Sequence, residues 1–180
     1  GGRRAHGPKV EKNWGRKLNL KERRLARDSA LSATTSVENV SARGHRFSED
    51  IESLPIVLGN YAEVRDGKTE EFSIEAFNHG SATRKVLAIF NEIGIGADLQ
   101  RARDGRNIRA GKATMRGRVH KTPKSVLLVV KEKSGLAQAA RNLPGVDVVA
   151  ARDLCAEDLA PGGDIGRLTV FTKDAVEALN

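Results

Sequence analysis

Cysteine, aromatic side chains and long apolar stretches are all scarce in this chain of 180 residues. Cys155 is the single cysteine, which excludes an internal disulfide framework or a cysteine-rich metal site and makes a reducing, cytosolic setting the default expectation. No apolar run approaches the ~20 residues of a membrane span, and we expect no signal peptide. A hydrophobic fraction of 39% is enough for one domain with a real core.

Residue patterns that support catalysis are also missing. No G-x-G-x-x-G follows a predicted strand, and no catalytic triad or carboxylate pair can be assembled. Cys155 stands beside Leu154 in an amphipathic segment, where we expect a buried small hydrophobe and not a reactive thiol. We therefore predict no enzyme activity, no cofactor and no metal site. The four histidines lack the spacing of metal ligands, and His79 is expected to be exposed: His6, His45, His79 and His120.

Acidic residues are absent from residues 106–124, where seven Lys and Arg residues give a local charge of +7. A second basic segment, residues 1–27, holds ten Lys and Arg residues against two acids. The remaining residues hold fourteen cations and twenty-one acids, although the whole chain has a net charge of +8. A mildly acidic body thus carries two concentrated basic segments, and this distribution favours a polyanionic partner.

Short apolar stretches alternate with amphipathic ones along most of the chain. The strongest strand signal is SVLLVVK, residues 125–131, with five consecutive apolar positions. Continuous apolar strands that alternate with helices are typical of a parallel sheet covered on both faces, which predicts the α/β class. Residues 61–80 fit neither pattern and are expected to be a variable loop or insertion. The predicted strands are 54–60, 125–131, 146–151 and 167–172, and the predicted helices are 19–40, 81–95, 135–145 and 173–179. A short helix or turn is predicted over 98–104, and a short helix followed by a turn over 152–163.

The first predicted helix combines a small buried face with cations that point elsewhere. Asn19 is a suitable N-cap, with Glu22 three residues later as in a capping box. The expected buried face consists of residues at i, i+4, i+7 and i+11, which are Ala26, Ala30, Ala33 and Val37. The cations that fall mostly on other faces are Arg23, Arg24 and Arg27.

The predicted helix over residues 81–95 has clear signals at both ends. Ser81 is a suitable cap at its start, and Gly94 is a suitable end. Val86, Phe90 and Ile93 share one face, so this helix is expected to pack against the sheet.

The stretch RAGKATMRGR, residues 109–118, contains a Gly-Lys pair that suggests a phosphate loop. A P-loop needs Gly, four residues and then Gly-Lys-Ser/Thr, after a strand and before a helix. Here Gly105 is six positions before Gly111, Lys112 is followed by Ala113, and the segment precedes a strand. The glycine spacing is wrong, the hydroxyl that would bind a metal ion is missing, and the position before a strand does not match a P-loop. A small-nucleotide site is therefore disfavoured.

A larger polyanion fits the same stretch better. Its cations recur every two to four residues, and Gly111 and Gly117 allow a close approach of the backbone. A solvated basic loop is the alternative at this point. Residues 1–18 lack periodicity, so we expect an extended arm that is ordered only against a partner. Within it, Trp14 either stacks on an unpaired base or pins the arm to the body.

Three motifs, in this order along the chain, resemble one family: GGRRAHGPK, RAGKATMRGR and LAPGGDIGRLTVFT. Over nearly its whole length the chain resembles the large-subunit ribosomal protein four family, in its archaeal/eukaryotic branch. Relative to that family, the N-terminal segment and the outgoing half of a long loop are absent. Gly7-Pro8 stands where two prolines are more usual, and residues 61–80 are longer than expected.

The resemblance implies a three-layer α/β/α core with a four-stranded, mainly parallel sheet lying on large-subunit rRNA. Residues 1–18 would be an extended basic arm, the returning half of a loop that lines the nascent-peptide exit tunnel, and residues 19–180 the globular rRNA-binding domain. The implied role is structural, in subunit assembly within cytoplasmic ribosomes, beside neighbouring ribosomal proteins. The alternatives are an extraribosomal RNA-binding regulator and a nucleotide-binding enzyme of Rossmann-like fold.

The predicted rRNA-binding residues come from both basic segments and from the first helix. No catalytic residue or metal ligand is predicted. The arm contributes Arg3, Arg4, His6, Lys9, Lys12, Trp14, Arg16 and Lys17; the first helix contributes Arg23, Arg24 and Arg27; and the middle segment contributes Arg106, Arg109, Lys112, Arg116, Arg118, Lys121 and Lys124.

Overall fold

A sheet of four parallel strands lies at the centre of the protein. The computed structural model describes residues 1–59, 61–65, 68–72, 74–76 and 82–179. The strand order is β1-β8-β6-β7, and every neighbouring pair is parallel. The predicted α/β class with a four-stranded parallel sheet is confirmed. The strands are β1 (Ile56–Leu58), β6 (Leu127–Val130), β7 (Asp147–Ala150) and β8 (Thr169–Thr172).

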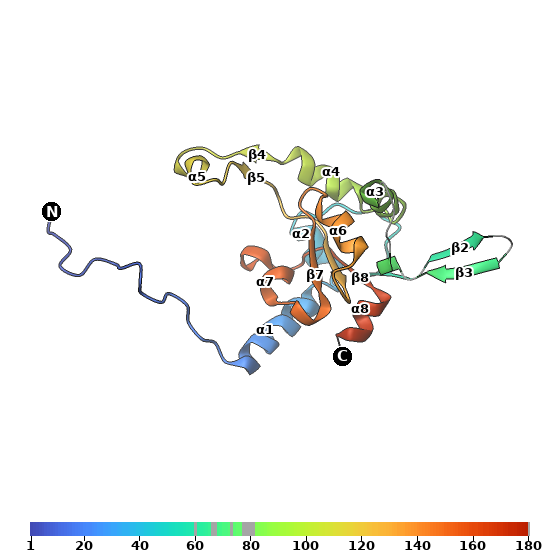
Figure 1. Cartoon of the computed structure of the whole chain (residues 1–180), viewed down its shortest axis with the longest axis horizontal. Helices are drawn as coiled ribbons and strands as arrows, with labels where there is room; N and C mark the ends of the chain where they lie inside the picture. The colour runs from blue at the N-terminus through green and yellow to red at the C-terminus, as the bar shows by residue number, and fades with distance from the viewer. Residues whose placement is uncertain (60, 66–67, 73, 77–81, 180) are drawn as a thin grey trace.

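The apolar run in β6 is explained by burial on both faces of the sheet. Side chains alternate between the two faces along a strand. Leu128 and Val130 therefore enter one core, and Leu127 and Val129 enter the other. The first core is covered by α2 (Val37–Ala42), α3 (Ala82–Glu92), α4 (Gly96–Asp104) and α6 (Gly135–Arg141), and the second by α1 (Leu20–Ala33), α7 (Ala156–Leu159) and α8 (Lys173–Ala178) (Figure 1).

The single helix predicted over residues 19–40 is in fact two helices. α1 ends at Ala33, where Thr34 donates its hydroxyl to the carbonyl of Leu31 at 2.7 Å. Ser36 then caps α2 by accepting the backbone N–H of Asn39 at 3.3 Å. Hydroxyl side chains that bond to nearby backbone groups compete with a continuous helix, and this is the physical reason for the break.

The predicted capping box of this segment does not form, and its predicted face is only partly buried. Asn19 is the N-cap residue of α1, as predicted, but its side chain makes no cap hydrogen bond, so the capping box does not form. Of the predicted face, Ala30 is buried, whereas Ala26 and Val37 are exposed. The first half of α1 extends beyond the layers (Figure 1), and the break before α2 interrupts the helical periodicity.

The segment expected to be a variable loop contains regular structure. β2 (Tyr61–Arg65) and β3 (Lys68–Phe72) form an antiparallel hairpin that projects from the body (Figure 1). The chain returns through η1 (Ile74–Ala76), where Ile74 enters the core and Glu75 accepts the backbone N–H of Lys131 at 2.7 Å. η1 is thus fastened to the end of strand β6. His79, which was expected to be exposed, lies outside the described residues.

The helix predicted over residues 81–95 is confirmed as α3. Val86 and Phe90 are buried and Ile93 packs against the same core. Gly94 follows with a φ of +89°, a left-handed conformation that ends the helix and favours glycine. The predicted cap Ser81 lies outside the described residues.

Cys155 is exposed, contrary to the expectation of a buried hydrophobe. It stands at the first turn of α7, where its backbone N–H and its thiol both donate to a carboxylate oxygen of Asp158, at 3.2 and 3.0 Å. Its neighbour Leu154 takes the buried position. Within the described ranges, no helix is long and apolar enough to cross a membrane.

Truncation of Phe90 tests the first core. Its side chain is 1% exposed, so Phe90→Ala is expected to lower the free energy of unfolding by about 3–5 kcal/mol. Leu25→Ala is the control, because Leu25 is 73% exposed and should change stability by no more than about 0.5 kcal/mol. Urea denaturation measures both variants, and equal effects would contradict the assignment of Phe90 to the core.

Candidate nucleic-acid interface

The basic hairpin, residues 106–124, is a projecting ribbon (Figure 1). β4 (Asn107–Ile108) pairs antiparallel with β5 (His120–Lys121), and α5 (Lys112–Met115) forms a helical turn between them. The backbone N–H of Arg109 donates to the carbonyl of Val119 at 2.8 Å, and the hydroxyl of Thr114 donates to the carbonyl of Arg109 at 2.7 Å. Local hydrogen bonds therefore give this segment a defined shape, which the sequence did not reveal.

All seven cations predicted on the basic hairpin are exposed. Lys124 differs from the rest because its Nζ lies 2.7 Å from Asp147. Within the described residues, the other six have no carboxylate partner: Arg106, Arg109, Lys112, Arg116, Arg118 and Lys121. Unpaired like charges on one ribbon produce a strongly positive local potential, which attracts a polyanion.

Two glycines shape the tip of the basic hairpin. Gly111 and Gly117 have φ values of +73° and +77°, in the left-handed region that side chains other than glycine rarely adopt. A Cβ at either position would meet nothing within 4 Å, so backbone conformation and not crowding requires glycine. The same open space leaves the backbone accessible to a ligand.

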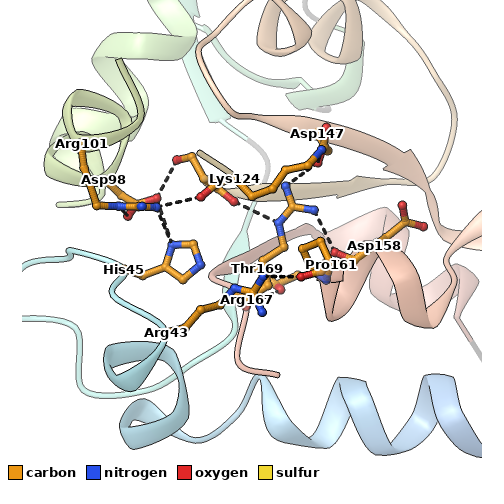
Figure 2. Close-up of polar contacts among 11 residues, drawn as sticks. Arg43, His45, Asp98, Arg101, Lys124, Asp147, Asp158, Pro161, Arg167 and Thr169 are labelled. Atoms are coloured by element: carbon orange, nitrogen blue, oxygen red, sulfur yellow. Dashed lines mark hydrogen bonds and ion pairs between the residues drawn. The ribbon is translucent and has the colours of Figure 1, made fainter. Parts of the chain in front are cut away.

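The foot of the basic hairpin is fixed to the body by the buried carboxylate of Asp98. Arg101 donates its Nε to Asp98 at 2.9 Å and its Nη2 to the carbonyl of Lys124 at 2.8 Å. Ser125 donates its hydroxyl to Asp98 at 2.6 Å, and His45 Nδ1 lies 3.1 Å from the same carboxylate (Figure 2). A carboxylate only accepts, so His45 donates from Nδ1. Asp98 thus connects α4, the residues that follow α2 and the end of the basic hairpin.

Hydrogen bonding dominates the acidity of Asp98. Burial by itself raises the pKa of this carboxyl group. The hydrogen bonds from His45, Arg101 and Ser125 act in the opposite direction, and the net result is a pKa well below the usual range. The carboxylate is therefore ionised whenever the protein is folded near neutral pH.

A second internal cation, Arg167, joins the sheet to α7. Its side chain is 1% exposed and donates to the carbonyls of Ser125 and Asp158, at 3.0 and 2.8 Å. It also pairs with Asp147 at 2.6 Å, so that Asp147 is shared with Lys124 (Figure 2). Burial raises the pKa of Asp147, but the hydrogen bonds from Lys124 and Arg167 outweigh it and lower the pKa. The charge of Lys124 is therefore partly neutralised by Asp147, although its side chain is 50% exposed.

The predicted residues of the arm do not contact the body. All of residues 1–18 are exposed, and the segment runs away from α1 (Figure 1). Trp14 is 68% exposed, and Lys12 lies over its ring at 5.0 Å, a cation–π contact within the arm. The alternative that Trp14 pins the arm to the body therefore has no support in the structure.

The three arginines of α1 are not equivalent. Arg23 and Arg24 are exposed, whereas Arg27 is half-buried and pairs with the adjacent Asp28 at 2.9 Å. Arg23 and Arg24 extend the basic arm onto the helix, and the charge of Arg27 is partly neutralised.

Sequence reasoning missed the residues that position the interface. Asp98, Arg101 and Arg167 were missed because most of their partners are distant in the sequence. Only the i, i+3 spacing of Asp98 and Arg101 on one helix hinted at a pair. Among the described residues, no group of three His, Cys, Asp or Glu side chains is arranged to hold a metal ion.

The whole chain, residues 1–180, matches the sequence profile described as the ribosomal protein L4/L1 family. The chain belongs to this family. It is 47% identical over its full length to the large ribosomal subunit protein uL4 of Methanococcus maripaludis. The protein of that name from Methanocaldococcus jannaschii is 46% identical over 99% of the chain, and that from Halobacterium salinarum 44% over 98%.

These L4/L1 family relatives are longer than this chain. The chain covers 65% of the Methanococcus maripaludis protein and 64% of the other two, which is less than two thirds of each relative. The resemblance stated from three sequence motifs, including its archaeal branch, is confirmed by these matches.

Replacement of Asp98 tests the anchor of the basic hairpin. Asp98→Asn leaves buried donors without a carboxylate, so the free energy of unfolding should fall by about 3–5 kcal/mol near neutral pH. The folded pKa of Asp98 is lowered, so its contribution is complete above the unfolded pKa of about 3.9 and is lost as the pH falls below it. The difference between wild type and variant should therefore shrink below about pH 4.

Urea denaturation across this pH range provides the measurement. Asp28→Asn is the matched control, because Asp28 is exposed and its pair with Arg27 should contribute no more than about 1 kcal/mol. A deficit in Asp98→Asn that stayed constant down to about pH 3 would contradict the role of the ionised carboxylate.

Proposed function

We propose that this chain is a structural constituent of the large ribosomal subunit that binds and stabilises large-subunit rRNA. The observation that carries the proposal is the basic hairpin. It holds six exposed cations without carboxylate partners among the described residues, on an acidic body in a chain of the ribosomal protein L4/L1 family. Relatives named large ribosomal subunit protein uL4 support the same assignment. In this role the chain is not an enzyme, and it resides in cytoplasmic ribosomes.

Electrostatics supplies the affinity in this proposal. Each phosphate contact by Lys or Arg releases condensed counterions from the RNA, so binding weakens steeply as salt rises. If ~8 phosphates are neutralised, the logarithm of the affinity falls with a slope of roughly −6 to −7 against the logarithm of the salt concentration. The hydrogen bonds within the basic hairpin fix the spacing of its cations, so RNA of the matching shape is favoured over other polyanions.

The arm has a different part in the proposed mechanism. Residues 1–18 are exposed along their whole length and carry cations around Trp14, an arrangement suited to a segment that becomes ordered on folded RNA. Their ordering would stabilise the folded rRNA during subunit assembly. We place the arm in the wall of the nascent-peptide exit tunnel, with neighbouring ribosomal proteins beside the body.

Neutralisation of four cations tests the role of the basic hairpin. Replacing Arg109, Lys112, Arg116 and Arg118 by Gln removes four phosphate contacts, and rRNA affinity at physiological salt should fall by orders of magnitude. The salt slope should flatten by roughly 3 to 4 units, while thermal stability stays unchanged because these side chains are exposed. Filter binding to large-subunit rRNA of Methanococcus maripaludis measures affinity and slope.

The control for the basic hairpin removes the same charge from the body. The four residues are exposed cations outside both basic segments: Arg84, Lys131, Arg152 and Lys173. Their replacement by Gln should change affinity far less than the hairpin replacements. Equal losses of rRNA affinity in the two quadruple variants would show that the basic hairpin contributes only through the net charge of the protein. No loss of affinity in either variant would contradict the proposed contact.

Trp14→Ala tests the arm separately from its charge. Because Trp14 makes no contact with the body, its removal should leave the melting temperature unchanged. A base stacked on an aromatic ring is worth roughly 1–3 kcal/mol, so rRNA affinity should fall by about 5- to 150-fold with an unaltered salt slope. Binding of Trp14→Ala as tight as that of wild type would show that no base stacks there.

A further inference from the structure

A hollow lies at the foot of the basic hairpin and is not used by the phosphate contacts proposed above. It has a volume of about 610 Å³ and is formed by α3, α4 and the turn that follows α6, residues 142–145. α3 packs against both α4 and α6, so these walls are part of the folded body. Arg106, the first residue of the basic hairpin, lines the hollow as well. The hollow is therefore continuous with the charged ribbon.

The lining of the hollow combines an apolar floor with cations and amides. Leu99 and Leu143 are buried residues at its base, and Leu87 is a 37% exposed residue of its wall. Arg103 and Arg106 are exposed, and within the described residues neither has a carboxylate partner. No carboxylate belongs to the lining; Asp104, nearby, accepts the amide of Gln100 at 2.9 and 3.1 Å. This charge distribution suits an anionic partner.

Two further amides are available in the hollow. Asn91 and Asn142 line it, both are exposed, and no side-chain hydrogen bond engages their amides within the described residues. A Cβ at Gly96 would collide with the amide of Asn91, although Gly96 does not have a positive φ. Glycine is therefore required at position 96 by lack of space for a side chain, and its small size lets the amide of Asn91 lie at the start of α4.

We propose that this hollow takes an unpaired nucleotide of the bound RNA. Leucine side chains offer a surface for the face of a base, and free amides offer both a donor and an acceptor for its polar edge. Arg103 and Arg106 supply charge for the adjoining phosphate. Unpaired bases that leave the stack are the usual targets of sequence-specific RNA recognition. The inference rests on the proposed function and adds to it a point of base recognition.

Filling the hollow without changing its charge provides the test. Leu87→Trp puts a larger side chain into the wall, and Val176→Trp, at a residue of α8 that is 39% exposed, is the matched control. In filter binding to large-subunit rRNA of Methanococcus maripaludis, Leu87→Trp should bind about tenfold more weakly with an unchanged salt slope. Val176→Trp should bind like wild type.

A second variant separates charge from shape. Arg103→Gln removes one phosphate contact, so it should weaken binding and flatten the salt slope by about one unit. Ultraviolet cross-linking of the wild-type complex should join a peptide containing residues 142–145 to one discrete nucleotide, and Leu87→Trp should lose this cross-link. Circular dichroism confirms that each variant is folded.

The outcomes distinguish this inference from the proposed function. If Leu87→Trp binds the rRNA as tightly as wild type and the cross-link is absent, the hollow takes no nucleotide, even when the hairpin variant has lost binding. Weaker incorporation of Leu87→Trp into reconstituted subunits, with unchanged binding to free rRNA, would assign the hollow to a protein side chain and overturn the inference. If wild type does not bind rRNA at all, both proposals fail together.

Discussion

The buried carboxylate of Asp98 is the interaction on which the geometry of this protein depends. It accepts hydrogen bonds from Ser125, from Arg101 and from the backbone of Arg46, and it lies beside His45. These residues belong to segments that are far apart in the sequence but meet where the basic hairpin leaves the body. Figure 2 shows Asp98 beside Arg101 and His45. A buried charge is tolerated only when it is paired and hydrogen-bonded. Loss of any one partner would leave the charge of Asp98 uncompensated and destabilise the fold, so the partners are held in fixed positions around it.

The cations of this chain fall into two groups with different physical roles. Arg101, Arg167 and Arg43 donate to backbone carbonyls of the body and fasten separate segments of the fold to one another. The cations of the basic hairpin and the arm lie in solvent without carboxylate partners among the described residues, apart from Lys124. The first group stabilises the body, whereas the like charges of the second group repel one another. The first group thus holds the base of the basic hairpin in a defined position.

Much of the fold could be predicted from the sequence, because its signals were local. Five apolar residues in a row predicted the central strand β6, and Gly94 predicted the end of α3. The break between α1 and α2 was missed because hydroxyl-to-backbone bonds at Thr34 and Ser36 outweighed an otherwise helical pattern. The basic hairpin was recognised by its charge and not by its shape, since β4 and β5 have only two residues each.

The interface was only partly predictable, for a related reason. Charge density located the exposed cations of residues 106–124, but it did not indicate the structural role of Arg167, whose burial depends on tertiary packing. Likewise, Lys124 was grouped with the RNA-binding cations although it pairs with Asp147, a residue of the neighbouring strand. Pairing of this kind is decided by the register of β6 and β7, and no local pattern contains that register.

Quantitative mass spectrometry of large ribosomal subunits, purified from the cells that make this protein, tests the central claim most directly. The account predicts one copy per subunit, retained through a wash at moderate salt and released as the salt concentration rises steeply. Recovery of the protein only in fractions free of ribosomes would contradict the account and would favour a regulator that acts outside the ribosome.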